Sequence, residues 1–225
     1  PPPVVQTPNP AATPVSGEEL VPLRGVALKI AENMSASLTL PTATTMRVIA
    51  VRQMEISRNI LNQHRAKLGQ SKISFTHLIG WALIEALQTN PALNNAFVET
   101  DGQSYRAVRG TVNLGIAVDV AGKDGSRSLK VPNIKNAGSL GFAAFLEAFD
   151  SVVGRARDNK LTLADFEGTT ISLTNPGTVG TFGSIPRLMP GQGAIIATGA
   201  IDYPPEFRAL DESARAALGV GKVMM

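Results

Sequence analysis

The chain has 225 residues, of which 44% are hydrophobic and 17% are charged. This is the composition of a globular chain with a sizeable core, and it excludes a wholly disordered or fibrous protein. The 21 basic and 18 acidic side chains leave a net charge of +3 that is spread along the sequence, so no nucleic-acid partner is predicted. The absence of cysteine excludes disulfides, thiolate metal sites and a cysteine nucleophile.

The first 17 residues differ in composition from the rest of the chain. Residues 1–17 contain six prolines and carry neither a charge nor an aromatic ring. Such a segment favours extended polyproline conformations and buries too little surface to fold. We therefore predict a flexible linker over 1–17, with a frayed terminus as the alternative, and an α/β domain over 18–225. With no signal-peptide pattern and no membrane-spanning run, we expect a cytoplasmic protein with no membrane partner.

Apolar residues recur with helical spacing in four segments. The predicted helices cover Leu23–Met34, Gln53–Leu68, Phe75–Leu87 and Leu140–Ala156. Ser74 is a suitable N-cap for the third helix, which is apolar around more than one face and should be deeply buried.

Alternating or β-branched segments predict the strands. They cover Ala43–Val51, the hairpin Ala96–Val98 and Tyr105–Val108 around an Asp101-Gly102 turn, Val112–Val120, its continuation Ser128–Ile134, Thr169–Thr174 and Gly193–Ala200. The order of helices and strands, without an internal repeat, indicates one α/β domain.

The two histidines and the single tryptophan are expected to be structural. His64 lies among polar residues and is most simply a solvated helix residue, whereas His77 follows Ser74 closely enough to help satisfy the start of its helix. Trp81 is expected in the core. The sequence contains no phosphate-binding loop, metal-binding His pair or serine-hydrolase elbow, and we expect no metal site.

A glycine-rich loop after a predicted strand is the most unusual feature. Thr174 and Asn175 end the strand, and glycines follow at 177, 180 and 183. Glycine permits close approach of the backbone to a ligand, and the two polar side chains could face a developing oxyanion. A tight turn with Asn-Pro-Gly chemistry remains the alternative at this point.

This segment resembles a known family. The chain is similar to the catalytic domain of the dihydrolipoamide acyltransferases in stretches that follow the family's order and spacing. These are Leu23–Ser35 with Pro41–Thr42, Asn90–Asn94, Val112–Val118 through Val131–Pro132, Arg155–Leu161, Thr169–Gly180 and Gly191–Ile201. These proteins are the E2 components of 2-oxoacid dehydrogenase complexes. The resemblance covers roughly residues 20–203 and implies a chloramphenicol-acetyltransferase-like mixed sheet flanked by helices.

The resemblance also implies the chemistry. The family moves an acyl group between a lipoyl thiol and coenzyme A, with the active site between subunits of a trimer. Thr174 matches the residue whose hydroxyl stabilises the tetrahedral oxyanion, and Asn175 follows it as in relatives. The catalytic base of the family is a histidine in a C-terminal motif that lies beyond Met225, so we expect the chain to be truncated before it and inactive alone.

Three details resemble one branch of the family, in which an actinobacterial multifunctional 2-oxoglutarate decarboxylase/dehydrogenase contains the domain. They are Ser172–Gly177, Ser184–Gly193 and Asp202–Phe207. This branch implies succinyl transfer in the tricarboxylic acid cycle and a fused 2-oxoglutarate dehydrogenase domain that uses thiamine diphosphate and magnesium. It implies two partners, a protein that bears a lipoyl domain and the enzyme dihydrolipoamide dehydrogenase.

Other functions and the substrate contacts stay open. A trimerisation and docking module without activity is one alternative, and a chloramphenicol-acetyltransferase-like enzyme is another. The candidate substrate-binding residues are Gly177, Gly180, Arg187 for a succinyl carboxylate, and Arg24 for the phosphates of coenzyme A. The alternative for each arginine is a solvated surface charge.

Overall fold

The computed structural model describes residues 16–122, 125 and 127–225, so the predicted linker lies almost wholly outside the described residues. At its centre is a mixed sheet with the strand order β7-β4-β8-β9. Its strands are β4 (Leu114–Ile116), β7 (Asn133–Ile134), β8 (Ile171–Thr174) and β9 (Ala194–Ala197). β4 is antiparallel to β7 and parallel to β8, and β8 is parallel to β9. The carboxyl ends of β4, β8 and β9 therefore lie at one edge of the sheet.

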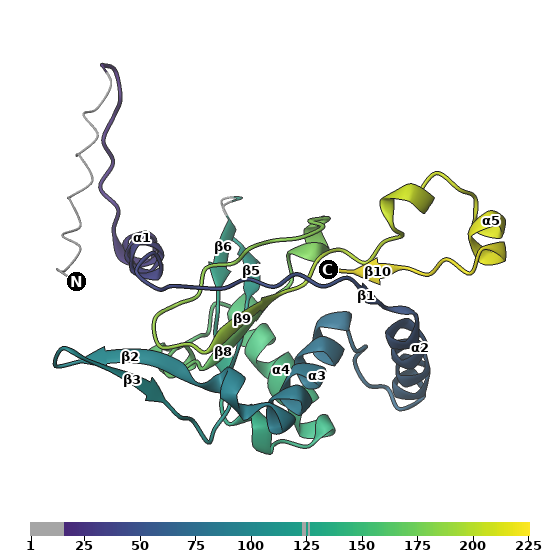
Figure 1. Ribbon diagram of the computed structural model, residues 1–225, viewed down its shortest axis with the longest axis horizontal. Helices are drawn as coiled ribbons and strands as arrows, with labels where there is room; N and C mark the ends of the chain where they lie inside the picture. The colour runs from purple at the N-terminus through teal and green to yellow at the C-terminus, as the bar shows by residue number, and fades with distance from the viewer. Residues whose placement is uncertain (1–15, 123–124, 126) are drawn as a thin grey trace.

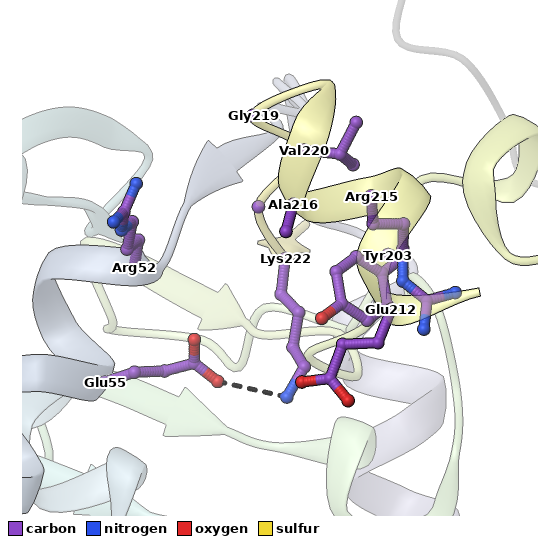
Figure 2. A pocket seen from close by; sticks show the side chains of 10 residues that line it. Arg52, Glu55, Tyr203, Glu212, Arg215, Ala216, Gly219, Val220 and Lys222 are labelled. Carbon is purple, nitrogen blue, oxygen red and sulfur yellow. Dashed lines mark hydrogen bonds and ion pairs between the residues drawn. The ribbon is translucent and has the colours of Figure 1, made fainter. Parts of the chain in front are cut away.

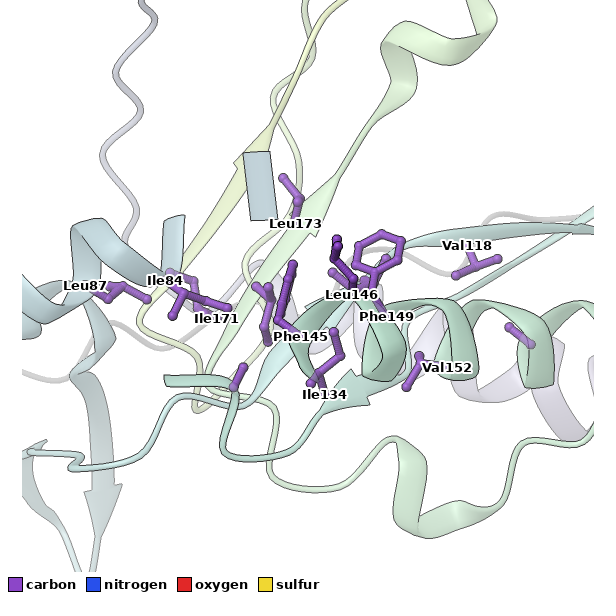
Figure 3. Close-up of a cluster of buried hydrophobic side chains, with 14 of the residues drawn as sticks. Ile84, Leu87, Val118, Ile134, Phe145, Leu146, Phe149, Val152, Ile171 and Leu173 are labelled. Carbon is purple, nitrogen blue, oxygen red and sulfur yellow. The ribbon is translucent and has the colours of Figure 1, made fainter. Parts of the chain in front are cut away.

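Two helices, α3 (Phe75–Thr89) and α4 (Phe142–Arg157), pack against this sheet (Figures 1 and 3). Phe145 of α4 is fully buried between Ile84 of α3 and the strand residues Leu114 and Leu173. Gly80 allows α3 to approach closely, because a Cβ there would lie 3.1 Å from Cζ of Phe145. The core thus fills the space between the sheet and the two helices.

Three two-stranded ladders and three further helices complete the described chain. The ladders pair β1 (Ile49–Ala50) with β10 (Val223–Met224), β2 (Ala96–Thr100) with β3 (Gln103–Ala107), and β5 (Val118–Ala121) with β6 (Arg127–Lys130), all antiparallel. The helices are α1 (Gly25–Ser37), α2 (Arg52–Lys67) and α5 (Glu212–Ala217). Short 3-10 turns cover Pro91–Asn94, Ala137–Ser139, Leu163–Asp165, Pro176–Val179 and Pro205–Phe207.

The predicted helices and the hairpin are confirmed to within a few residues at their ends. Ser74 caps α3 and accepts a hydrogen bond from the backbone N–H of His77. In the hairpin, Asp101 and Gly102 both have positive φ, as a tight turn between twisted strands requires. These signals are local, so they determine structure without help from distant residues.

The strand predictions need correction in two places. The segment Val112–Val120 is not one strand: it breaks at Ala117, whose N–H donates to the carbonyl oxygen of Leu173 (2.9 Å). Ser128–Ile134 breaks likewise at Pro132, because proline has no N–H to donate to a ladder. Of Ala43–Val51, Ile49 and Ala50 lie in a ladder, and the Val51 N–H donates to the carbonyl oxygen of Lys222 (3.1 Å). Residues 41–50 are exposed.

Helix α1 forms as predicted, but its apolar stripe does not pack on the described chain. Leu23, just before the helix, is 55% exposed, and Ile30 and Met34 are 44% and 42% exposed. In Figure 1, α1 lies apart from the helices that cover the sheet.

The central position of Phe145 makes a direct test of the core. Phe145→Ala should lower the free energy of unfolding by about 3–5 kcal/mol, because it removes a fully buried ring and leaves a cavity. Phe97→Ala, on the exposed side of the hairpin, is the matched control and should change it much less. Urea denaturation of both variants checks this, and equal effects would contradict the assigned core.

Candidate functional site

Thr174 lies at the carboxyl end of β8, opposite Ala197 of β9. Its carbonyl oxygen accepts a hydrogen bond from the N–H of Thr198 (3.0 Å), which fixes its backbone. The side chain is half-buried, and its hydroxyl makes no hydrogen bond within the described residues. A fixed backbone with an uncommitted hydroxyl is the arrangement that a donor to a developing charge requires.

The alternation of β8 separates the two sides of this site. Ile171 and Leu173 belong to the core under α3 and α4, whereas the hydroxyl of Ser172, on the other face, contacts Oε1 of Gln192 (2.8 Å). Because successive side chains of a strand point to opposite faces, Thr174 shares the face of Ser172. The hydroxyl of Thr174 is therefore directed away from the helix-covered core.

Asn175 connects the end of β8 to α3. Its side-chain Nδ2 donates to the hydroxyl of Thr76 in the first turn of α3 (2.8 Å). One of its two amide protons is thus committed to holding the strand end against the helix. Asn175 is half-buried, and within the described residues its other amide proton has no hydrogen-bond partner.

The two candidate glycines after Asn175 have different structural roles. Gly177 donates its N–H to the carbonyl oxygen of Thr198 (3.2 Å), and a Cβ at Gly177 would lie 2.2 Å from the carbonyl oxygen of Gly199. Only glycine fits this contact between backbones. Gly180 ends the following 3-10 turn with φ of +85°, which glycine adopts without strain. Contact of either glycine with a substrate stays a prediction.

A hollow of about 250 Å³ opens between the end of β8 and the start of α3. We call it the α3 hollow. It is lined by Arg58, Ser74, Phe75, Thr76, Ile79, Asn175, Gly177, Thr178, Gly199, Ile201 and Met224. Its volume suits a small molecule or part of a larger one. Sequence reasoning found Asn175 and Gly177 but missed Arg58 and Thr76, because only the fold brings α2 and α3 to this corner.

The two candidate arginines lie elsewhere. Arg24 directly precedes α1, and Arg187 lies in the loop between β8 and β9. Both are exposed, and neither lines the α3 hollow. Their predicted contacts with coenzyme A phosphates and with a succinyl carboxylate stay predictions.

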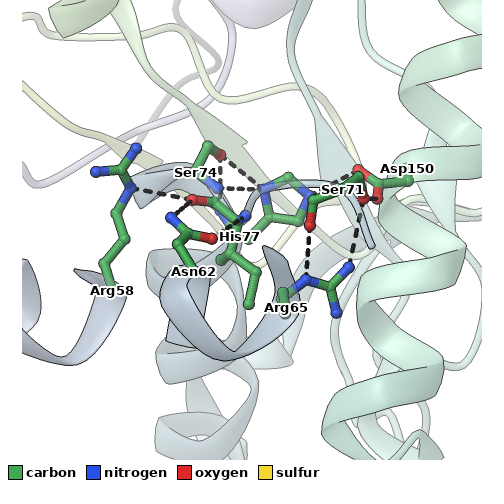
Figure 4. A network of polar contacts seen from close by, with 8 residues as sticks. Arg58, Asn62, Arg65, Ser71, Ser74, His77 and Asp150 are labelled. Carbon is green, nitrogen blue, oxygen red and sulfur yellow. Dashed lines mark hydrogen bonds and ion pairs between the residues drawn. The ribbon is translucent and has the colours of Figure 1, made fainter. Parts of the chain in front are cut away.

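His77 has the structural role predicted for it (Figure 4). Its Nδ1 accepts the N–H of Ser74 (3.2 Å) and lies 2.7 Å from the Ser74 hydroxyl, and its Nε2 lies 2.9 Å from Oδ1 of Asp150. Burial lowers the pKa of His77, which outweighs the opposite effect of Asp150. The ring is neutral at pH 7 with both nitrogens engaged, so it is not free to act as a base. His64 is exposed, as predicted.

A second hollow, of about 330 Å³, lies between α2 and α5 (Figure 2). Nζ of Lys222 lies 3.3 Å from Oε1 of Glu55, so these two charges partly neutralise each other. The Arg215 guanidinium lies over the Tyr203 ring at 4.2 Å. Arg52 and Glu212 also line it. With basic and acidic groups mixed, this α5 hollow does not favour one sign of ligand charge.

The family comparison identifies an acyltransferase catalytic domain. The family described as the 2-oxoacid dehydrogenases acyltransferase (catalytic domain) matches residues 15–225, and the chain belongs to it. The resemblance found in the sequence is confirmed. The multifunctional 2-oxoglutarate metabolism enzyme of Mycolicibacterium vanbaalenii is 49% identical over 207 residues, and that of Mycobacterium sp. strain JLS is 49% identical over 217 residues. The alignments cover 92% and 96% of the chain but 17% of each relative, so the chain spans about a sixth of their length.

Solved structures confirm the predicted fold class. The dihydrolipoamide acetyltransferase of Azotobacter vinelandii superposes with a TM-score of 0.77 at 22% identity, over 96% of this chain and 85% of that one. The truncated catalytic core of the 2-oxoacid dehydrogenase multienzyme complex of Thermoplasma acidophilum gives a TM-score of 0.70 at 26% identity, over 92% and 85%. Both show the mixed sheet with flanking helices that this chain adopts.

Two further searches of the described residues gave negative findings. No described helix is both long and apolar enough to cross a bilayer. Among residues 16–122, 125 and 127–225, no cluster of three His, Cys, Asp or Glu side chains is placed to bind a metal ion.

The lowered pKa of His77 predicts how stability depends on pH. An unperturbed histidine titrates near pH 6.5, and the folded chain disfavours protonation of His77. The contribution of neutral His77 to the free energy of unfolding is therefore complete above about pH 6.5, and it falls as the pH drops through the lowered pKa. His77→Gln should remove this part of the dependence. Asp165 and Asp211, with lowered pKa values, titrate below this window.

Urea denaturation between about pH 5 and pH 7.5 measures the effect. The exposed His64→Gln variant serves as the control and should keep the slope of the wild type. An identical slope in the His77→Gln variant would show that His77 is not held neutral by the fold.

Proposed function

We propose that this chain carries an acyl-transfer site that moves a succinyl group between dihydrolipoamide and coenzyme A, as part of a 2-oxoglutarate dehydrogenase. Membership of the acyltransferase family supports the reaction class. The names of the 49% identical relatives support 2-oxoglutarate as the parent substrate. The uncommitted Thr174 hydroxyl, fixed at the end of β8, is the observation that carries the proposal.

The reaction needs a donor where negative charge develops. When a thiolate attacks the thioester carbonyl carbon, a carbon–sulfur bond forms and the carbonyl oxygen becomes an oxyanion. The intermediate then collapses and releases the other thiol as the leaving group. The Thr174 hydroxyl donates to that oxyanion, and Asn175 positions the strand end and offers its second amide proton.

A general base must also act, because a thiol with a pKa near 8.5 is mostly protonated at neutral pH. His77 is engaged at both nitrogens and His64 lies outside the α3 hollow. We infer that the base comes from residues outside the described ones, as the family resemblance implies. No step of the transfer is assigned to either histidine.

The proposal includes the assembly. The exposed apolar residues of α1 support a homotrimer in which α1 packs on a neighbouring copy. A lipoyl-bearing protein and dihydrolipoamide dehydrogenase would act as partners. Thiamine diphosphate and magnesium would serve a fused dehydrogenase domain, as the resemblance implies.

Removing the Thr174 hydroxyl tests the chemistry. Thr174→Ala should lower the rate of succinyl transfer from succinyl-dihydrolipoamide to coenzyme A by about 10²–10³, the usual cost of one oxyanion donor. Thr174→Ser retains a hydroxyl and should keep most of the rate. The rates are measured in the full-length protein.

The same assay separates the alternatives. An unchanged rate in Thr174→Ala, with assembly still dependent on the domain, would favour a trimerisation and docking module without activity. Acetylation of chloramphenicol by the wild type, without transfer to dihydrolipoamide, would favour a chloramphenicol-acetyltransferase-like enzyme.

A charge on α1 tests the assembly. Ile30→Glu should shift the trimer towards monomer in sedimentation at micromolar concentration, because it places a charge in a contact between apolar surfaces. Ser35→Glu adds the same charge to an exposed polar position of the helix and is the control. A trimer that withstands both changes, or a monomeric wild type, would contradict the role of α1.

A further inference from the structure

We propose that the α3 hollow is a carboxylate-binding subsite and that Arg58 selects dicarboxylic acyl groups such as succinyl over acetyl. The inference rests on the proposed function, because it assigns the substrate class of that same site. It replaces Arg187, the sequence candidate for this role, with a residue of α2 that the sequence analysis did not single out. The observations below concern the charge of the hollow, the geometry of Arg58 and the position of the hollow.

The charge of the α3 hollow favours an anion. Arg58 is the one charged side chain among its lining residues in the described chain, and no carboxylate lines it. The α5 hollow differs, because there Glu55 and Glu212 lie among the cations. A cation that lines a small hollow without an acidic neighbour attracts a ligand carboxylate and disfavours an uncharged methyl group.

Arg58 is held so that its terminal nitrogens are available. Its Nε donates to the carbonyl oxygen of Ile73 (3.0 Å), and its guanidinium lies over the Phe75 ring at 4.5 Å. Within the described residues, neither terminal nitrogen has a hydrogen-bond partner. Figure 4 shows these two nitrogens turned away from the network around His77.

This geometry suits carboxylate recognition. The two terminal N–H groups of a guanidinium match the two oxygens of a carboxylate, and a side chain already fixed at Nε and by stacking loses little freedom on binding. The remaining wall supplies apolar contacts for the methylene groups of an acyl chain through Ile79, Ile201 and Met224. Hydroxyl and amide groups of Ser74, Thr76 and Asn175 complete it.

The hollow lies next to the proposed reaction centre. Asn175 and Gly177, which follow Thr174 directly in the chain, form part of its wall, as does Gly199 after β9. In a succinyl group only two methylene groups separate the thioester carbon from the free carboxylate. A selecting cation must therefore lie near the end of β8. Arg58 lines the same hollow as Asn175, the residue that follows Thr174, whereas the solvent-exposed Arg24 and Arg187 do not line it.

The test compares two acyl donors. Succinyl-CoA and acetyl-CoA are supplied separately with dihydrolipoamide to the full-length protein, and kcat/KM is measured for each. Arg58→Met should lower the value for succinyl-CoA by about 10- to 100-fold, the loss expected when a charged group loses its hydrogen-bonding partner, and should change that for acetyl-CoA by less than about 3-fold. Arg58→Lys, which keeps the charge without the planar fork, should give an intermediate loss.

Two further variants control the comparison. Arg52→Met removes an arginine from the same helix outside the α3 hollow and should leave the donor preference unchanged. Arg187→Met tests the competing candidate. The proposal is overturned if Arg58→Met slows both donors equally, which would indicate a structural role, or if Arg187→Met abolishes the preference instead.

A binding measurement keeps this test separate from the proposed function. Should the wild type transfer neither acyl group, the proposed function fails, and calorimetric titration of the protein with succinyl-CoA and acetyl-CoA decides the subsite alone. A preference for succinyl-CoA that Arg58→Met and, more weakly, Arg58→Lys reduce would support it. Equal binding of both thioesters to the wild type would overturn it. Thermal unfolding of each variant verifies that it is folded.

Discussion

The parallel pairing of β8 between β4 and β9 is the constraint on which the site depends. It places Thr174 opposite Ala197 and brings the following loop against the chain that leaves β9. The loop can approach the chain after β9 because neither Gly177 nor Gly199 has a side chain. A Cβ at Gly177 would lie 2.2 Å from the carbonyl oxygen of Gly199. The N–H of Gly177 then reaches the carbonyl oxygen of Thr198. Close backbone contact of this kind fixes a strand end more firmly than a surface loop would.

The end of β8 divides the chemistry between two faces of the sheet. Thr174 shares the open face with Ser172, whereas Asn175 turns to α3 and contacts Thr76. The core beneath α3 and α4 holds the strand in place and contributes no chemistry of its own. His77 belongs to that supporting structure, since it caps α3 and contacts Asp150 of α4. In this account α3 and α4 orient the site, and the strand end and α2 supply the groups that meet the substrate.

Local signals predicted most of the helices, and non-local pairing explains the failures. Ser74 marks the start of α3 and the Asp101-Gly102 turn marks the hairpin, because caps and turns depend only on neighbouring residues. The break at Ala117 depends on a hydrogen bond to Leu173, which no local pattern reveals. The motif around Thr174 was recognised from sequence, but Arg58 was not, because its place beside Asn175 exists only after α2 and α3 have packed.

The central claim is that the Thr174 hydroxyl meets the reacting thioester. A crystal structure of the full-length protein with coenzyme A tests this most directly, since the thiol sulfur is a strong and easily placed scatterer. The account predicts that the sulfur lies within about 4 Å of Thr174 Oγ1, on the face of β8 shared with Ser172. A thiol bound elsewhere, for example in the α5 hollow beside Lys222, with Thr174 covered by protein, would contradict it.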